Sequence, residues 1–134
     1  MTEIFEVETS APEQSLDITE RVREIVKRAG VEEGLCQVMV LHSTCAVVVN
    51  ETADSNIGRD VLAALARAVP TKGDWLHDQI DDNAAAHIKA SILGPSELLP
   101  VSRGELLLGT WQGIWLFELD GPRRRRVAVH VLGG

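Results

Sequence analysis

The sequence contains no tyrosine and only two phenylalanines, so aromatic residues make up 4% of its 134 positions. Positive charge is also scarce, because 13 lysines and arginines stand against 20 aspartates and glutamates, and the net charge is −7. Neutralising the phosphates of DNA or RNA requires a basic surface. We therefore expect no nucleic-acid partner.

Long hydrophobic runs are missing as well. No stretch approaches the roughly 20 apolar residues that cross a bilayer, and the acidic start, residues 1–10, lacks the basic and then apolar pattern of a secretory signal. The only cysteines, Cys36 and Cys45, lie in apolar segments and are expected to be reduced, buried thiols. These absences predict a cytoplasmic protein with no membrane partner.

The residues that are present are typical of a globular protein, with 45% hydrophobic and 25% charged. A length of 134 residues fits a single domain, 1–134, with no room for a second. Surface scaling predicts that about two-thirds of the unfolded chain's surface is buried on folding, which is enough for a core without disulfides.

Hydrophobic periodicity predicts the elements of the first two-thirds of the chain. Apolar spacing and turn residues favour strands at 4–7, 35–41 and 46–49, and helices at 17–29 and, after a cap at Asp54 or Ser55, up to Pro70. Residues 71–86 are polar and are expected to form a long loop, and residues 84–93 are expected to form a short helix.

The last third has the pattern of strands separated by turns. Strands are expected at 97–101, 105–108, 114–119 and 126–132, and the last two are expected to pair as a hairpin around 120–122. Helices and strands that do not alternate regularly predict an α+β fold.

Two of the histidines are spaced so that they could bind one metal ion. His77 lies in the polar loop and His87 follows ten residues later on the short helix, and neutral imidazole suits zinc and related ions. Asp78, Asp81 and Asp82 could orient these rings or complete the site. The spacing alone also fits ordinary surface or hydrogen-bonded histidines, so both interpretations stay open.

An arginine run and a tryptophan are the other candidates for binding a ligand. In the run 123–126, alternate arginines face opposite ways, so Arg124 and Arg126 are candidates to grip a phosphate from one face, unless the run is simply an exposed arm. Trp111, between Gly109 and Gly113, is a candidate to stack on a flat ligand. Its alternative role is packing in the core or at an oligomer interface.

Several motifs together resemble the YjbQ family, a group of small bacterial and archaeal proteins labelled secondary thiamine-phosphate synthases. The resemblance extends over nearly the whole chain, from about residue 3 to residue 132. The motifs that carry it, in chain order, are 42–46 (HSTCA), 50–51 (NE), 77–78 (HD), 83–93, 94–96 (GPS), 109–114 (GTWQGI) and 121–126. One departure is Cys45, where family members usually have alanine or serine.

The resemblance implies an α+β fold with a mixed β-sandwich or barrel core, two main helices and a short one. It also implies a homotrimer with a site near a subunit interface. Carried over to this sequence, His42, His77 and His87 match the family's histidine positions and would hold a divalent metal ion, zinc or magnesium/manganese. The family's polar motif positions match Asn50, Glu51, Lys89 and Gln112.

The family label implies a transferase reaction. In it, a thiazole phosphate nitrogen displaces pyrophosphate from a pyrimidinylmethyl diphosphate. A metal with Lys89 or the arginines would stabilise the departing pyrophosphate, and Trp111 would stack on the heteroaromatic ring.

Two other functions need the same pocket and stay open. One is a metal-dependent hydrolase of a small phosphorylated substrate, with Glu51 or an acid of the 78–82 loop, such as Asp78, as general base. The other is a non-enzymatic, oligomeric protein that binds a metal or a small ligand. The sequence does not separate the three.

Overall fold

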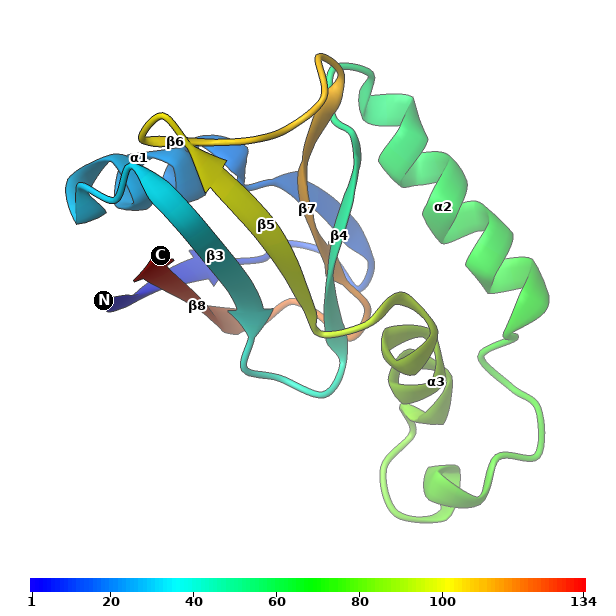
Figure 1. The fold of residues 1–134 in the computed structure, drawn as a ribbon. Coiled ribbons are helices and arrows are strands. Elements are labelled where there is room, and N and C mark those ends of the chain that lie inside the picture. Colours follow the sequence, from blue (N-terminus) through cyan, green and yellow to red (C-terminus); the bar gives the residue numbers. More distant parts are fainter.

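The computed structural model describes residues 1–134 and folds them into two antiparallel β-sheets and three α-helices (Figure 1). This confirms the predicted α+β fold with a two-sheet core. The elements, in chain order, are β1 (Thr2–Glu8), β2 (Gln14–Asp17), α1 (Thr19–Ala29), β3 (Glu33–Val40), β4 (Cys45–Glu51), α2 (Ser55–Ala68), the 3-10 helix η1 (Leu76–Gln79), α3 (Ala84–Leu93), β5 (Ser96–Ser102), β6 (Glu105–Leu106), β7 (Gln112–Glu118) and β8 (Arg124–Gly133).

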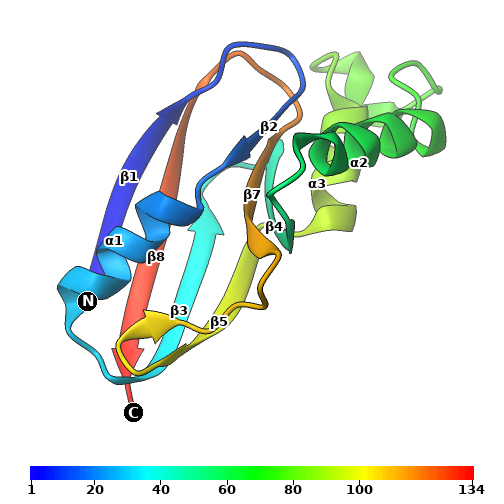
Figure 2. The same ribbon diagram turned by 90° about the horizontal axis from the view of Figure 1, so that it is seen from above.

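The two sheets pack as successive layers. The larger sheet has the strand order β1-β8-β3-β5-β6 and the smaller one β2-β7-β4. Figure 2 shows α1 beside the larger sheet. The smaller sheet lies between α1 and the two helices α2 and α3. The main core, a cluster of 18 buried residues, joins α1 to both sheets, and a second cluster of six lies between the smaller sheet and α3.

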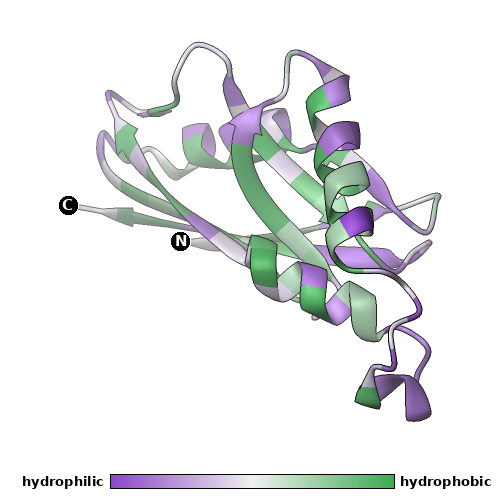
Figure 3. Cartoon of the chain, turned by 90° about the vertical axis from the view of Figure 1, so that its right-hand side faces the viewer, coloured by the Kyte–Doolittle hydropathy of each residue, from purple (hydrophilic) through white to green (hydrophobic).

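The smaller sheet is therefore covered on both faces, which explains the continuous apolar sequence of β7. Ile114 and Leu116 point into the main core, whereas Trp115 and Phe117 pack towards Ala86 and Ala90 of α3. In Figure 3, α2 and α3 carry hydrophobic and hydrophilic residues side by side, as expected of helices with one covered face. None of the helices combines the length and hydrophobicity needed to cross a bilayer.

The helix boundaries confirm most of the sequence signals. Asp54 caps α2 by accepting a hydrogen bond from the backbone N–H of Asn56 at 2.9 Å. Gly30 follows α1 with φ of 68°, the left-handed conformation that a glycine accepts without strain. The short helix α3 has the predicted bounds, Ala84–Leu93.

The chain path differs from the sequence prediction in three respects. The last two strands do not pair: β7 lies in the smaller sheet, and β8 runs between β1 and β3 in the larger one. The reason is burial, because β7 is covered on both faces, whereas β8 alternates between buried and exposed residues. Strand β2 was not predicted, and the expected loop 71–86 contains the 3-10 helix η1.

The larger sheet leaves one face without any covering helix. We call this the outer sheet face; it is the side of β1, β8, β3 and β5 that points away from α1 (Figure 2). Apolar side chains are exposed on it, alternating along each strand with residues of the core. They are Ile4, Leu35, Met39, Leu98 and Leu132.

Candidate active site

The three predicted histidines lie in one cleft of about 510 Å³. His42 comes from the turn between β3 and β4, His77 from η1 and His87 from α3. Their convergence joins three segments that are separate in the sequence. The full lining is Leu41, His42, Ser43, Thr44, His77, Asp81, Asn83, His87, Asp120, Arg123 and Arg125.

His42 is fixed to the backbone of β8. Its Nε2 accepts a hydrogen bond from the backbone N–H of Arg126 at 2.9 Å, so the neutral ring carries its proton on Nδ1. Burial, and after it the positive charge of Arg125, lowers the pKa of His42 below its ordinary value. His42 is therefore a neutral ring at pH 7.

His77 and His87 face each other across the junction between η1 and α3. Their ring centroids are 4.8 Å apart and the ring planes meet at 81°. Asp78 holds this junction, because its Oδ1 accepts the backbone N–H of Ala84 at 2.9 Å. The Nε2 atom of His77 is buried, makes no hydrogen bond and lies 3.9 Å from Oδ2 of Asp81.

These donors have the right chemistry for a metal ion but do not form a complete ligand set. Nowhere in the structure do three or more histidine, cysteine or acidic side chains group closely enough to hold one. His77 offers a free buried nitrogen, whereas His42 uses Nε2 for the Arg126 amide. The metal site stays a prediction.

Arg125 forms the floor of the cleft and is only 2% exposed. It is bound to the fully buried Glu118, with Nε donating to Oε2 at 2.7 Å, and it also donates to the carbonyl and hydroxyl oxygens of Thr44. Burial alone would raise the pKa of Glu118, but hydrogen bonds, first of all from Arg125, outweigh it and lower that pKa. The floor is therefore a closed ion pair.

Arg123 is the exposed cation of the cleft. Its Nη2 lies 3.0 Å from Oδ2 of Asp120, and more than half of its side chain is open to solvent. A partly exposed guanidinium at the mouth of a cleft can exchange such a contact for a phosphate, which it binds in bidentate fashion.

The two arginines proposed from the sequence, Arg124 and Arg126, do not line this cleft. Both are exposed, and Arg124 is paired with Glu6 and Glu8 of the neighbouring strand β1. The signal for Arg125 was present in the sequence. Side chains of a strand point alternately to its two faces, so Arg125 points to the same face as Val127 and Val129. Its neighbours in the run point to the opposite face.

Lys89, another sequence candidate, is buried behind the cleft. Its Nζ lies 3.0 Å from Oε2 of Glu13, and it lines a separate cavity of about 220 Å³. Asn83 and Asp120 line both cavities and are joined by a hydrogen bond of 2.9 Å. Lys89 is thus separated from the histidines by this pair of side chains.

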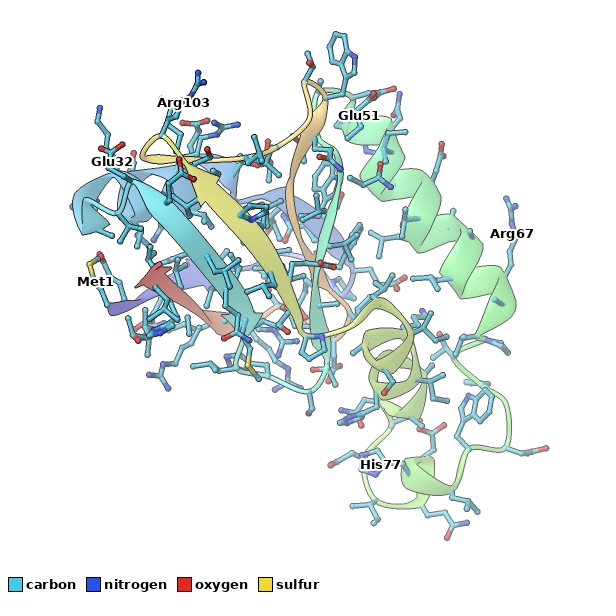
Figure 4. The ribbon with its side chains drawn as sticks, viewed as in Figure 1. Met1, Glu32, Glu51, Arg67, His77 and Arg103 are labelled. Carbon is cyan, nitrogen blue, oxygen red and sulfur yellow. The ribbon has the colours of Figure 1, made fainter.

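The remaining candidates lie at the other end of the smaller sheet. In the β4–β7 pair, Cys45 is opposite Glu118 near the cleft, and Glu51 is opposite Gln112 at the far end. A strand of seven residues spans about 20 Å. Figure 4 shows Glu51 and His77 at opposite ends of the molecule. The far cluster consists of Asn50, Glu51, Trp111 and Gln112, with Trp111 66% exposed.

Comparison with known proteins decides the family. The model of the UPF0047 protein YjbQ-like family matches residues 3–134. The chain belongs to this YjbQ-like family. A UPF0047 protein of Methanothermobacter thermautotrophicus is 39% identical over 132 residues, covering 98% of this chain and 92% of the relative. YugU of Bacillus subtilis is 32% identical and covers 99% of this chain and 100% of the relative.

Solved structures of YjbQ-like proteins have the same fold. A protein of unknown function from Sulfolobus solfataricus superposes with a TM-score of 0.96 at 39% identity, covering 100% of this chain and 97% of the other. A hypothetical protein from Aeropyrum pernix gives a TM-score of 0.96 at 40% identity, covering 100% and 99%. The names of these relatives state no reaction.

Proposed function

We propose that this YjbQ-like protein is an enzyme that acts on a small phosphorylated substrate, with the transferase reaction of a thiamine-phosphate synthase as the first candidate. The observation that carries the proposal is that three imidazoles and the exposed guanidinium of Arg123 line one cleft. Clefts with convergent polar groups and a shifted pKa are typical of active sites.

The residues of the cleft suit the departure of diphosphate. In the transferase reaction, the thiazole nitrogen forms a bond to the methylene carbon of the pyrimidinylmethyl diphosphate. The bond from that carbon to the diphosphate oxygen breaks, and its electron pair leaves with the oxygen. N–H groups of Arg123 and of the neutral His42 ring would stabilise the charge that develops on this oxygen. We further propose a divalent metal ion at His77 and His87; His42 would have to release the Arg126 amide to join it.

A second candidate function, hydrolysis of a phosphate ester, is favoured by the pair of His77 and Asp81. Both side chains line the cleft, where a ring nitrogen of His77 would accept the proton of the attacking water; no hydrogen bond from Asp81 orients the ring. Glu51 would have to come from a neighbouring subunit to act as the base, because it lies at the far end of β4. Binding without turnover would instead indicate a non-enzymatic ligand-binding protein.

We also propose a homotrimer in the cytoplasm. The outer sheet face exposes apolar side chains beside the charged pairs of β1 and β8 and offers a surface for subunit contact, and a neighbouring copy could bring Trp111 or Glu51 towards the cleft. Both cysteines are buried and unpaired, as expected in a reducing compartment.

The test of the phosphate site is pyrophosphate binding, measured by calorimetry with magnesium present. We expect Arg123→Ala to weaken binding about tenfold to a hundredfold, since hydrogen bonds to charged groups contribute roughly 1.5–3 kcal/mol. Arg67→Ala removes an exposed cation of α2 that does not line the cleft, and should leave binding unchanged. Equal pyrophosphate affinity of the wild type, Arg123→Ala and Arg67→Ala would contradict the proposed phosphate site.

The metal is tested separately by elemental analysis of the untagged protein. About one zinc or manganese ion per chain, lost in His42→Ala, His77→Ala and His87→Ala, would establish the site. Turnover of phosphate esters that a chelator abolishes would favour the hydrolase over the synthase. No bound metal after zinc and manganese have been offered would leave the histidines as proton-transfer or binding groups.

A further inference from the structure

A second, smaller cavity of about 240 Å³ adjoins the histidine cleft. We call it the side chamber. It shares His42, Ser43 and His87 with the cleft, so these three residues form the boundary between the two spaces. The side chamber extends from them towards α3 and the turn before β5. Its remaining lining residues are Cys45, Ala90, Ser91 and Pro95.

The two cavities differ in chemistry. The cleft contains two arginines and two aspartates, with Leu41 as its one apolar residue. The side chamber has no arginine, lysine or acid beyond the shared boundary, and Cys45, Ala90 and Pro95 supply apolar walls. Charged groups therefore favour the cleft, and an uncharged organic group favours the side chamber.

Cys45 belongs to the wall of the side chamber rather than to any nucleophilic machinery. Burial raises the pKa of its thiol to about 12, so the thiol is protonated at neutral pH. A protonated, buried cysteine behaves as a small hydrophobic residue. This accounts for a thiol beside the histidines without giving it a role in the reaction.

We propose that the cleft and the side chamber are two halves of one substrate site. The phosphate or diphosphate of the substrate occupies the cleft at Arg123, and a compact, uncharged organic group occupies the side chamber. The junction between them lies at His42 and His87. This inference rests on the proposed function and specifies its substrate class: an organic phosphate or diphosphate whose organic part is small.

Size supports this division. Sites for small molecules usually measure about 300–1,000 Å³, so the side chamber is too small to hold a substrate alone but large enough for part of one. A single ring fits such a space better than a long chain. The organic group then packs against α3 of the same subunit, and Trp111, which precedes β7 at the far end of the smaller sheet, is not needed to hold it.

The test compares two probes, inorganic pyrophosphate and benzyl diphosphate, by calorimetry with magnesium present. We expect benzyl diphosphate to bind the wild-type protein about tenfold more tightly, because the ring is removed from water in the side chamber. Ser91→Phe places a large side chain in the side chamber from an exposed position on α3. In this variant, the ratio of the two affinities should fall to about one.

Ile92→Phe is the matched control. It adds a phenylalanine at the next position of α3, where the side chain is 60% exposed and lines neither cavity, so the affinity ratio should stay at its wild-type value. Equal thermal unfolding of both variants would show that each is folded. A wild-type ratio of one, or a ratio that Ser91→Phe leaves unchanged, would exclude the side chamber as the site of the organic group. Pyrophosphate binding would in that case still support the proposed function. No pyrophosphate binding by the wild type would remove both.

Discussion

Arg125 shows how a single side chain connects the core to the candidate site. Its guanidinium is buried and neutralised by Glu118, so it contributes little free charge to a ligand in the cleft. Its hydrogen bonds to Thr44 instead hold the turn that carries His42 and Ser43 against β8. We therefore regard Arg125 as a positioning residue and Arg123 as the ligand-binding cation.

Breaking this ion pair should be costly. We expect Arg125→Met to lower the free energy of unfolding by about 3–5 kcal/mol, because it leaves the Glu118 carboxylate buried without its partner. The double variant Arg125→Met/Glu118→Leu should recover much of the loss. Arg124→Ala, which breaks an exposed pair, should cost far less. Urea denaturation measures all three, and equal losses in the two single variants would contradict the prediction.

The lowered pKa of His42 gives stability a predictable pH dependence. Because the folded protein binds this proton less readily than the unfolded chain, His42 favours folding fully above its unfolded pKa, about 6.5. That contribution is lost as the pH falls from there towards the folded pKa. His42→Gln keeps an acceptor for the Arg126 amide but does not titrate, so its stability should fall less steeply below pH of about 6.5. Parallel profiles in urea denaturation would contradict this.

At the scale of elements, the sequence predicted local structure better than pairing. The Gly94–Pro95 stop located the end of α3, because this signal lies next to the helix in the sequence. The partner of β8 could not be predicted, because the choice between β7 and the pair β1 and β3 depends on which faces are buried. For the same reason, the sequence grouped Glu51 with the histidines although β4 separates them.

The junction of η1 and α3 depends on one capping carboxylate. We expect Asp78→Ala to lower the free energy of unfolding by about 1 kcal/mol, because the N–H of Ala84 loses its acceptor. Faster hydrogen exchange should be confined to residues 76–93, where His77 and His87 meet. Asp78→Asn retains a side-chain oxygen and should restore most of the protection. Asp82→Ala, an exposed acid in the same loop, is the control, and an equal effect there would exclude capping by Asp78.

For the whole molecule, the outer sheet face is the feature that a single chain leaves unexplained. α1 and the smaller sheet cover one side of the larger sheet, and the other side exposes Leu98, Met39 and Leu132. Exposed apolar residues grouped on a flat surface are typical of protein contact sites. The cleft is next to this face, because Leu41 and His42 follow the exposed Met39 on the same strand end.

If the outer sheet face joins three copies, light scattering should give about three times the 14.6 kDa mass of one chain. Met39→Glu/Leu98→Glu would then place two carboxylates per chain in an apolar interface, and the protein should become monomeric while it stays folded, since both side chains are exposed in the single chain. Leu76→Glu/Ile80→Glu adds the same charge on the η1 loop, where the side chains are 82% and 80% exposed, and should leave the trimer intact. A monomeric wild-type protein, or a trimer that survives the first pair of substitutions, would place subunit contact elsewhere or exclude it. In that case Trp111 and Glu51 would have no route to the histidine cleft through this face, and the site would have to work with the residues of one chain.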